Sequence, residues 1–282
     1  MILARTIAEA RSALTDLRRE HGCLGLVPTM GALHAGHLSL VRAARTHCDA
    51  VAATIFVNPL QFGPGEDFAR YPRTFDADRA LLEAEGVDLL FAPDAAEVTP
   101  PGTSTYVEVE GIQDRLDGAS RPGHFRGVAT IVAKLFHIFE PEHAFFGQKD
   151  AAQVAILRRM VRDLNFPVQV VVCPIVREPD GLAMSSRNRY LSQEDRGHAV
   201  VLSRALRRVE EQAATGILGA TALLEAGRAV LAAETAVRVD YFSIVDPDTL
   251  EDRPDVREGA LVALAAFVGP ARLIDNVLLP PR

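Results

Sequence analysis

The chain has 282 residues, of which 48% are hydrophobic and 24% charged, as in an ordinary globular protein. Its formal net charge is −7, which argues against a large nucleic-acid-binding surface, because such a surface needs clustered Lys and Arg. No apolar run reaches the roughly 18 residues of a membrane span, and the first residues lack the apolar core of a signal peptide. We therefore expect a cytoplasmic protein with neither nucleic acid nor membrane as a partner.

Strands and helices are predicted to alternate through the first two thirds of the chain. Apolar runs of four to nine residues predict strands, and apolar residues at helical spacing predict the helices between them. The residues 50–57 are almost continuously apolar, as expected for a strand buried on both faces. The predicted strands are residues 24–27, 50–57, 87–91, 143–146 and 168–176, and the predicted helices are residues 38–48, 74–85, 123–139 and 151–164.

The helix at residues 74–85 has clear predicted ends. Thr74 is a suitable N-cap, and Gly86 ends the helix. Ala80, Leu81 and Ala84 are expected on its buried side.

This order of elements predicts an α/β fold, with a Rossmann-like parallel sheet covered by helices on both faces. Ligands of such folds bind beyond the carboxyl ends of the strands. The segments to inspect are therefore residues 28–37, 58–65, 147–150 and 177–188.

The pattern changes after residue 188, where helices at 193–215 and 221–234 precede strands at 237–245 and 260–267. The polar stretch before it contains Pro179, Asp180 and Gly181 and suits a hinge. We expect residues 1–177 to form the Rossmann-like domain and residues 178–282 a smaller α+β lid domain.

The three cysteines, Cys23, Cys48 and Cys173, are widely spaced in the sequence and lie in apolar surroundings. This usage predicts buried free thiols in a reducing compartment.

His34 and His37 fall in the first turn of the helix that follows the first predicted strand. Free backbone N–H groups and the helix dipole make this position an anion site, and phosphate is the commonest anion. Gly31 and Gly36 permit close backbone approach. Two alternatives stay open: the histidines cap the helix or lie on the surface, or they bind a metal, although no third ligand follows at a typical spacing.

Lys149 and Asp150 follow the predicted strand at 143–146. Lys149 suits a phosphate, and Asp150 suits a ribose hydroxyl, unless Lys149 is merely exposed and Asp150 caps the next helix.

The loop from Gly181 carries Ser185, Ser186 and Arg187, which can bind a polyphosphate and close over a nucleotide. The alternative is that this loop is a polar linker between domains.

Two glutamines, Gln61 and Gln153, can bind hydroxyl and carboxylate groups without adding charge, unless they are ordinary surface residues. The turn at residues 121–127 is interpreted as structural or as a subunit contact.

Several of these segments carry a family resemblance. The motif HAGH at residues 34–37 is similar to the His-x-Gly-His signature of the nucleotidyltransferase superfamily, which includes class I aminoacyl-tRNA synthetases. The whole set closely resembles the pantothenate synthetase (pantoate–β-alanine ligase) family, over about residues 1–279. Its motifs are VPTMGALH (27–34), IFVNPLQF (55–62), YPRT (71–74), FFGQKD (145–150), MSSRNRYL (184–191) and RLIDN (272–276).

The resemblance implies an ATP-dependent ligase with two half-reactions. Pantoate attacks the α-phosphorus of ATP, giving pantoyl adenylate and pyrophosphate, and β-alanine then attacks the acyl carbon, giving pantothenate and AMP. ATP, pantoate and β-alanine are the implied small-molecule partners. Mg²⁺ with ATP, no tightly bound organic cofactor, and a homodimer are also implied.

The resemblance also implies roles for individual residues. The implied catalytic residues are His34, His37, Lys149 and Arg187. The implied ATP-binding residues are Pro28, Thr29, Met30, Gly31, His34, His37, Gly147, Lys149, Asp150, Val176, Met184, Ser185, Ser186 and Arg187. The implied pantoate-binding residues are Met30, Asn58, Gln61 and Gln153.

The chain departs from related patterns at two points. Ala183 stands where class I synthetases carry the first Lys of Lys-Met-Ser-Lys-Ser, which favours the ligase family over synthetases. Gln148 stands where Glu is frequent. The Mg²⁺ ligands are not securely placed; Asp76 and Asp78 are candidates, and ATP oxygens can supply most ligands.

Two other functions are compatible with parts of this pattern. Another small-substrate nucleotidyltransferase would share the histidine pair but not obviously the set of Asn58, Gln61 and Gln153. A non-catalytic nucleotide sensor would have no need to retain His34, His37, Lys149 and Arg187 together. A tRNA synthetase is disfavoured by the acidic charge and the length.

Overall fold

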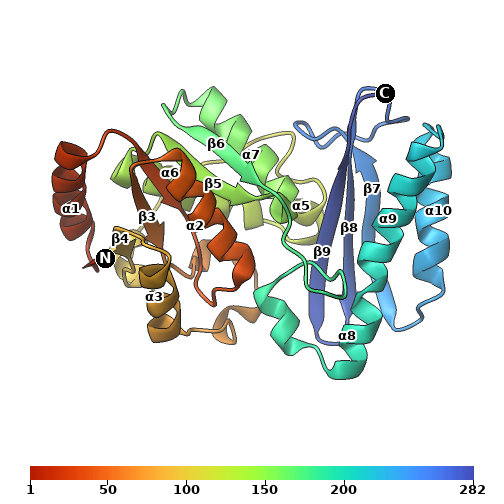
Figure 1. The fold of residues 1–282 in the computed structure, drawn as a ribbon, viewed down its shortest axis with the longest axis horizontal. Coiled ribbons are helices and arrows are strands. Elements are labelled where there is room, and N and C mark those ends of the chain that lie inside the picture. Colours follow the sequence, from red (N-terminus) through yellow and green to blue (C-terminus); the bar gives the residue numbers. More distant parts are fainter.

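A computed structural model describes residues 1–282. The chain forms a six-stranded parallel sheet and, beside it, a three-stranded antiparallel sheet (Figure 1). The strands of the first sheet are β1 (Ile2–Ala4), β2 (Leu24–Val27), β3 (Ala50–Thr54), β4 (Leu89–Phe91), β5 (His143–Gly147) and β6 (Gln169–Cys173).

The strand order β1-β4-β3-β2-β5-β6 places a topological switch point between β2 and β5. The chain runs outward from β2 through β3 to β4, then returns to the other side of β2 with β5. The loops after β2 and β5 therefore diverge, which leaves a crevice at their carboxyl ends. This confirms the predicted fold class and locates the place where a ligand fits.

Helices cover both faces of this sheet. One apolar cluster includes residues of α1 (Ile7–Glu20), α6 (His124–Phe139) and α7 (Ala151–Asp163). A second cluster packs α2 (Ala35–His47) and Leu82 of α3 (Phe75–Ala84) against the opposite face. Successive strand residues divide between the clusters, Leu26 in the first and Val27 in the second, as the alternation of side chains requires.

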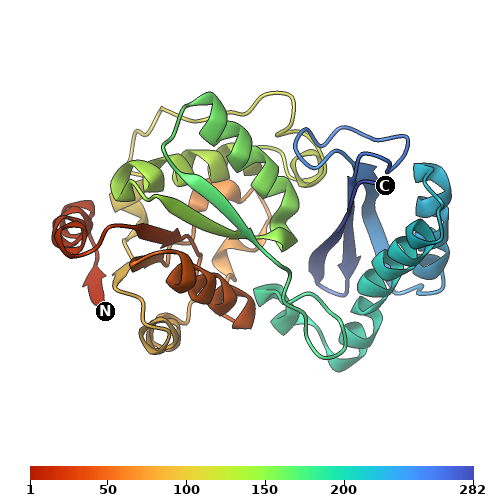
Figure 2. The ribbon, with the colours of Figure 1, turned by 45° about the horizontal axis from the view of Figure 1, so that its top comes forward.

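The second sheet consists of β7 (Val237–Val245), β8 (Ala260–Val268) and β9 (Ala271–Leu279). Its outer face packs on α9 (Val201–Ala214) and α10 (Ala220–Ala232) (Figure 2). Leu261 and Ala263 of β8 belong instead to the large core of the first sheet. The remaining short helices are α4 (Ala95–Val98), α5 (Asp117–Ser120) and α8 (Gln193–Ala199), with 3₁₀ turns η1 (Pro59–Gln61), η2 (Asp67–Ala69), η3 (Gln148–Asp150) and η4 (Ser186–Tyr190).

The prediction for the buried side of α3 is wrong. Ala80, Leu81 and Ala84 are exposed, and the helix buries Asp78 and Leu82. The Asp78 carboxylate accepts hydrogen bonds at 2.8 Å from the backbone N–H groups of Ala32 and Leu33. A polar anchor therefore sets the rotation of this helix, and apolar spacing could not show it.

Other boundaries differ in instructive ways. The helix predicted at 193–215 is two helices that meet at Val200. The strands predicted at 50–57 and 168–176 end earlier, at Thr54 and at Cys173, the latter directly before Pro174, which cannot donate to a ladder. The elements β1, α1 and β9 were not predicted. No helix is both long and apolar enough to cross a membrane.

Candidate active site

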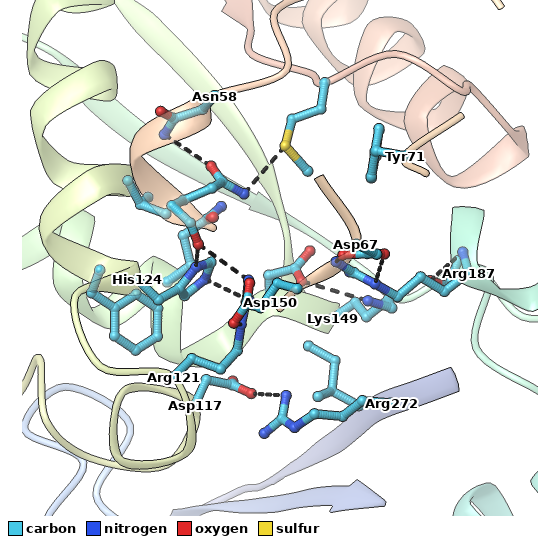
Figure 3. Close-up of a pocket in the computed structure, with 18 of the residues that line it drawn as sticks. Asn58, Asp67, Tyr71, Asp117, Arg121, His124, Lys149, Asp150, Arg187 and Arg272 are labelled. Atoms are coloured by element: carbon cyan, nitrogen blue, oxygen red, sulfur yellow. Dashed lines mark hydrogen bonds and ion pairs between the residues drawn. The ribbon is translucent and has the colours of Figure 1, made fainter. Parts of the chain in front are cut away.

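A cavity of about 750 Å³ lies at the carboxyl ends of β2 and β5 and extends to the second sheet (Figure 3). Eleven of the predicted site residues line it, although they come from four separate segments of the chain. They are Pro28, Thr29, Met30, His37, Asn58, Gln61, Lys149, Asp150, Gln153, Ser185 and Arg187.

His34 and His37 hold each other at the start of α2. The backbone N–H of Gly36 donates to His34 Nδ1 at 3.2 Å, and the backbone N–H of His34 donates to His37 Nδ1 at 3.3 Å. The ring centroids are 4.1 Å apart. Because each Nδ1 accepts a hydrogen bond, the proton of each neutral ring is on Nε2. The histidines thus cap the helix, as one alternative held, and still present Nε2–H donors.

Both rings are neutral at physiological pH. Burial, with the nearby Lys149 charge, lowers the pKa of His34 to about 4. Burial, with the neighbouring His34, lowers the pKa of His37 to about 3. The two histidines are therefore suited to donate hydrogen bonds to an oxygen that gains negative charge, rather than to carry charge themselves.

The loop between β2 and α2 is fixed by buried polar contacts. Thr29 Oγ1 donates to the Thr54 carbonyl at 2.6 Å, and Gly31 adopts φ +82°, a conformation that favours glycine. Asp78 holds the next two backbone N–H groups, as described above, and does not line the cavity. The suggestion that Asp78 binds Mg²⁺ is therefore wrong; Asp76 is exposed and also outside the cavity.

Two cationic side chains, Lys149 after β5 and Arg187 in η4, line the cavity. Lys149 Nζ lies 3.5 Å from Asp150 Oδ1. Asp150 makes no capping hydrogen bond to α7, so the alternative role of helix cap is wrong. Arg187 makes a bidentate ion pair with Asp67, and both N–O distances are 3.0 Å. Because the side chains of Arg187 and Lys149 are both largely buried, their charges act in a poorly hydrated space.

Six predicted residues do not line this cavity but lie around it. His34 caps α2, and Gly31 shapes the loop before it. Ser186 is buried, with its hydroxyl 3.3 Å from that of Tyr71. The backbone N–H of Met184 donates to the Val176 carbonyl at 3.0 Å. Gly147 ends β5 and pairs with Cys173 of β6.

The side-chain amides of Asn58 and Gln61 form one wall of the cavity beside Met30, which we call the amide wall. Gln61 Nε2 lies 3.2 Å from Met30 Sδ, and Asn58 Nδ2 donates to Gln61 Oε1 and to the Gly127 carbonyl, both at 3.0 Å. A Cβ at Gly127 would lie 2.2 Å from the Leu60 carbonyl oxygen, so only glycine allows this contact with α6. Asn58 thus orients Gln61, which faces the cavity.

Several cavity residues were missed or misread in the sequence. Arg121 and His124 line the cavity, although the turn at 121–127 is interpreted from the sequence only as structural or as a subunit contact. Arg121 binds Glu66 at 2.6 and 2.9 Å and donates to His124 Nε2 at 3.1 Å. Burial, together with the Arg121 charge, lowers the pKa of His124 to about 4.

The second sheet contributes Arg272, which binds Asp117 at 2.7 Å (Figure 3). Arg272 also binds Asp240 at 2.8 Å. In the sequence, Arg272 stands out only as part of the RLIDN motif. Its partners are 155 and 32 residues away in sequence, so no local pattern relates them.

Asn276 of β9 connects the second sheet to the cavity. Its Nδ2 donates to the carbonyls of Gln148 and Lys149 at 2.9 and 3.0 Å, and its Oδ1 accepts from Gln148 Nε2 at 3.0 Å. The neighbouring Asp275 is buried and binds Arg177 at 2.6 and 2.9 Å. The backbone that carries Lys149 is therefore positioned by the C-terminal strand.

Comparison with known proteins agrees with this geometry. The Pantoate-beta-alanine ligase family model matches residues 2–278. The chain is 64% identical to the pantothenate synthetase of Acidobacterium capsulatum, over 98% of this chain and 96% of that protein. It is 51% identical to the crystal structure of pantothenate synthetase from Thermus thermophilus, with a TM-score of 0.95 and full coverage of both chains.

A more distant structure is that of the pantoate-beta-alanine ligase from Francisella tularensis, in complex with Beta-gamma ATP and beta-alanine. It is 33% identical, with a TM-score of 0.82, over 99% of this chain and 97% of that one. Family model, sequences and structures agree over nearly the whole length, and the chain belongs to the pantoate-beta-alanine ligase family.

Proposed function

We propose that the cavity binds ATP and pantoate side by side, activates pantoate as its adenylate, and then releases the pantoyl group to β-alanine. As a member of this family the protein is an ATP-dependent ligase that makes pantothenate. The observation that carries the site assignment is the convergence of His37, Lys149 and Arg187 with the amide Gln61 in one cavity.

In the first step, a pantoate carboxylate oxygen forms a bond to the α-phosphorus of ATP as the bond to pyrophosphate breaks. The nucleophile is already an anion, so no general base is needed. What the site must supply is alignment and dispersal of charge on phosphoryl oxygens. The Nε2–H groups of His34 and His37 and the ammonium of Lys149 meet that need.

The phosphates would also recruit Arg187. In the absence of ligand its guanidinium is paired with Asp67, and a triphosphate offers a competing anion with matching oxygens. Ser185 accepts a hydrogen bond from the backbone N–H of Arg187 at 3.2 Å and lines the cavity beside it. We assign the segment from Met184 to Arg187 to the triphosphate.

Pantoate would lie against the amide wall. Gln61 and Gln153 are neutral and can bind its hydroxyl and carboxylate groups without neutralising the nucleophile. Met30 supplies an apolar contact for the methyl groups of the acid. In the second step the amine of β-alanine attacks the acyl carbon, a proton leaves the nitrogen, and AMP departs with the acyl C–O electron pair.

Mg²⁺ would accompany ATP, and the cavity suits it. Most carboxylates there are paired with arginine: Glu66, Asp67, Asp117 and Asp240. Asp150 instead has only Lys149 as an ion-pair partner, and its side chain is 47% exposed. A magnesium ion needs few protein carboxylates, since waters and phosphate oxygens complete its octahedron. Asp150 is the residue that would hold it, and the ion would supply charge neutralisation at the phosphates.

The division at residues 177 and 178, with a C-terminal lid, also remains our proposal. It is supported by the separate apolar cluster between the second sheet and α9 and α10. We further propose a cytoplasmic homodimer, which sedimentation at several protein concentrations would test.

The decisive experiment is exchange of labelled pyrophosphate into ATP, measured with pantoate and with a panel of other hydroxy acids. We expect exchange that depends on pantoate and needs no β-alanine. Absence of pantoate-dependent exchange would refute the adenylate route, whereas equal exchange with other acids would refute the assignment of Gln61 and Gln153 to pantoate.

A further inference from the structure

A second group of reactive side chains lies at the opposite edge of the parallel sheet. Cys23 directly precedes β2, Cys48 ends α2, and His143 is the first residue of β5. One ligand atom of each residue lies within 4.8 Å of the others. Because these residues stand at the amino ends of parallel strands, they are separated from the cavity by the length of the sheet.

We propose that Cys23, Cys48 and His143 form a binding site for Zn²⁺. Two sulfurs and one imidazole are ligands that this ion prefers, and a water completes its tetrahedron. Binding forms two Zn–S bonds and one Zn–N bond, and the two thiol protons leave to solvent, so no oxidant or reductant takes part.

The histidine distinguishes a metal site from a chance pair of thiols. His143 Nδ1 is buried and has no hydrogen-bond partner. Nearly all buried polar atoms in proteins have a partner, so an orphaned ring nitrogen beside two thiols needs an explanation. A metal ion would satisfy a ring nitrogen of His143, whereas a disulfide between Cys23 and Cys48 would leave this histidine without a partner.

The charges around the cluster favour a cation. Two carboxylates lie beside the cluster: Asp49 accepts a hydrogen bond from the backbone N–H of Cys23 at 3.0 Å, and Glu142 accepts one from that of Leu24 at 2.8 Å. The C-terminal end of α2, where Cys48 lies, adds the negative end of a helix dipole.

Space and access are also suitable. Cys48 is only 8% exposed, whereas Cys23 and His143 are half-buried, so an ion can enter from solvent. A Cβ at position 25 would lie 3.1 Å from Cys48 Sγ, so Gly25 leaves room for the thiol. The backbone N–H of Leu24 donates to Glu142 and that of Cys23 donates to Asp49, and these bonds fix the backbone at the start of β2.

The site would link three segments that local sequence does not connect. Zinc would join the entry of β2, the end of α2 and the entry of β5, which flank the same topological switch point as the cavity. Since the ion binds only the folded arrangement, it should stabilise the protein against unfolding.

The test uses the purified full-length enzyme, stripped of metal and kept reduced, and titrated with Co²⁺ as a spectroscopic probe. We expect one equivalent to produce the near-ultraviolet thiolate-to-cobalt band and the strong visible bands of a tetrahedral site, and Zn²⁺ to displace it. Cys23→Ser and His143→Gln should each weaken binding by more than about 100-fold, since even outer-shell partners cost 10–100-fold. Both residues are half-buried, so these variants avoid the fully buried Cys48.

Cys173→Ser is the matched control, because this cysteine is buried at the other end of the sheet. It should bind Co²⁺ like the unmodified protein. Zn²⁺ should also raise the melting temperature of the unmodified protein and of Cys173→Ser, but not of His143→Gln. The proposal is overturned if Co²⁺ gives no thiolate band, if the band survives in Cys23→Ser, or if peptide mapping of the enzyme purified without reductant finds a Cys23–Cys48 disulfide.

Discussion

The two edges of the parallel sheet carry opposite chemistry. At the carboxyl edge, Lys149, Arg187 and the neutral donors His34 and His37 surround a cavity that suits anions. At the amino edge, the two thiols and His143 lie beside the carboxylates of Asp49 and Glu142, which suits a cation. Helix α2 runs from one edge to the other, because its N-terminus lies at the cavity and its C-terminus ends at Cys48.

This contrast shows how a parallel fold separates two sites by geometry. All strands point the same way, so every strand exit lies at one edge and every entry at the other. Helix dipoles reinforce the division, with positive ends at the strand exits and negative ends at the entries. If the carboxyl edge alone performs the chemistry, substitutions at that edge should slow the reaction, whereas substitutions at the amino edge should not.

The largest effect is expected at the histidine pair. His37→Ala removes the half-buried imidazole that we propose as a donor to the phosphates, and it should slow pyrophosphate exchange by about 10²–10³-fold. His47→Ala is the control, because His47 lies on the same helix at the amino edge and is exposed. Circular dichroism should show that both variants are folded. Near-normal exchange in His37→Ala would remove this residue from the mechanism.

The buried neutral His124 predicts how stability depends on pH. Its folded pKa is about 4, below the roughly 6.5 of an unfolded histidine, so the unfolded state binds more protons between these values. The free energy of unfolding should therefore fall as the pH is lowered from 7 to 5, by about 2 kcal/mol from this residue, or ~30-fold in the unfolding equilibrium.

Urea unfolding at pH 7 and pH 5 measures this dependence. His124→Asn should reduce this dependence by the share of one histidine, since the amide keeps a donor for the Gln61 carbonyl but does not titrate, while His34 and His37 still contribute. His137→Asn, on the exposed face of the same helix, should leave it unchanged. An equal fall in stability in His124→Asn and the unmodified protein would contradict the prediction.

Binding of the acid should depend on the amide wall. Gln61→Ala should raise the pantoate KM about tenfold, the scale of one hydrogen bond, with little change in the rate at saturation. Steady-state exchange as a function of pantoate concentration measures both. Gln169→Ala, at the exposed entry of β6, should have no effect. An unchanged pantoate KM in Gln61→Ala would place the acid elsewhere.

The smallest effect is expected from the contact between the two sheets. Asn276→Ala leaves two carbonyls beside Lys149 without their donor and should reduce exchange about fivefold, equivalent to ~1 kcal/mol. Leu278→Ala, exposed on the same strand, provides the comparison. If Asn276→Ala exchanges pyrophosphate as fast as Leu278→Ala does, Lys149 is positioned without help from β9.

Much of the fold could be predicted because its signals are local. The apolar strand before Pro28, the Gly-containing turn and the histidine pair lie within 14 residues, and the strand, turn and helix that they predict are confirmed. Asp78 shows where local reasoning stops: the burial of α3 is set by a carboxylate that binds a loop 45 residues away. The spacing of apolar residues cannot predict a buried carboxylate of this kind.

The sequence by itself determined the alternation of strands and helices, the edge of the sheet at which the cavity lies, and most of the segments that meet there, because these follow from periodicity and strand direction. Only the tertiary structure brought Arg272 to Asp117, Asn276 to the backbone of Lys149, and Cys23 and Cys48 to His143. It also decided that the histidines are neutral. The physical reason is that burial and partner choice depend on packing between residues far apart in the chain, which no local pattern encodes.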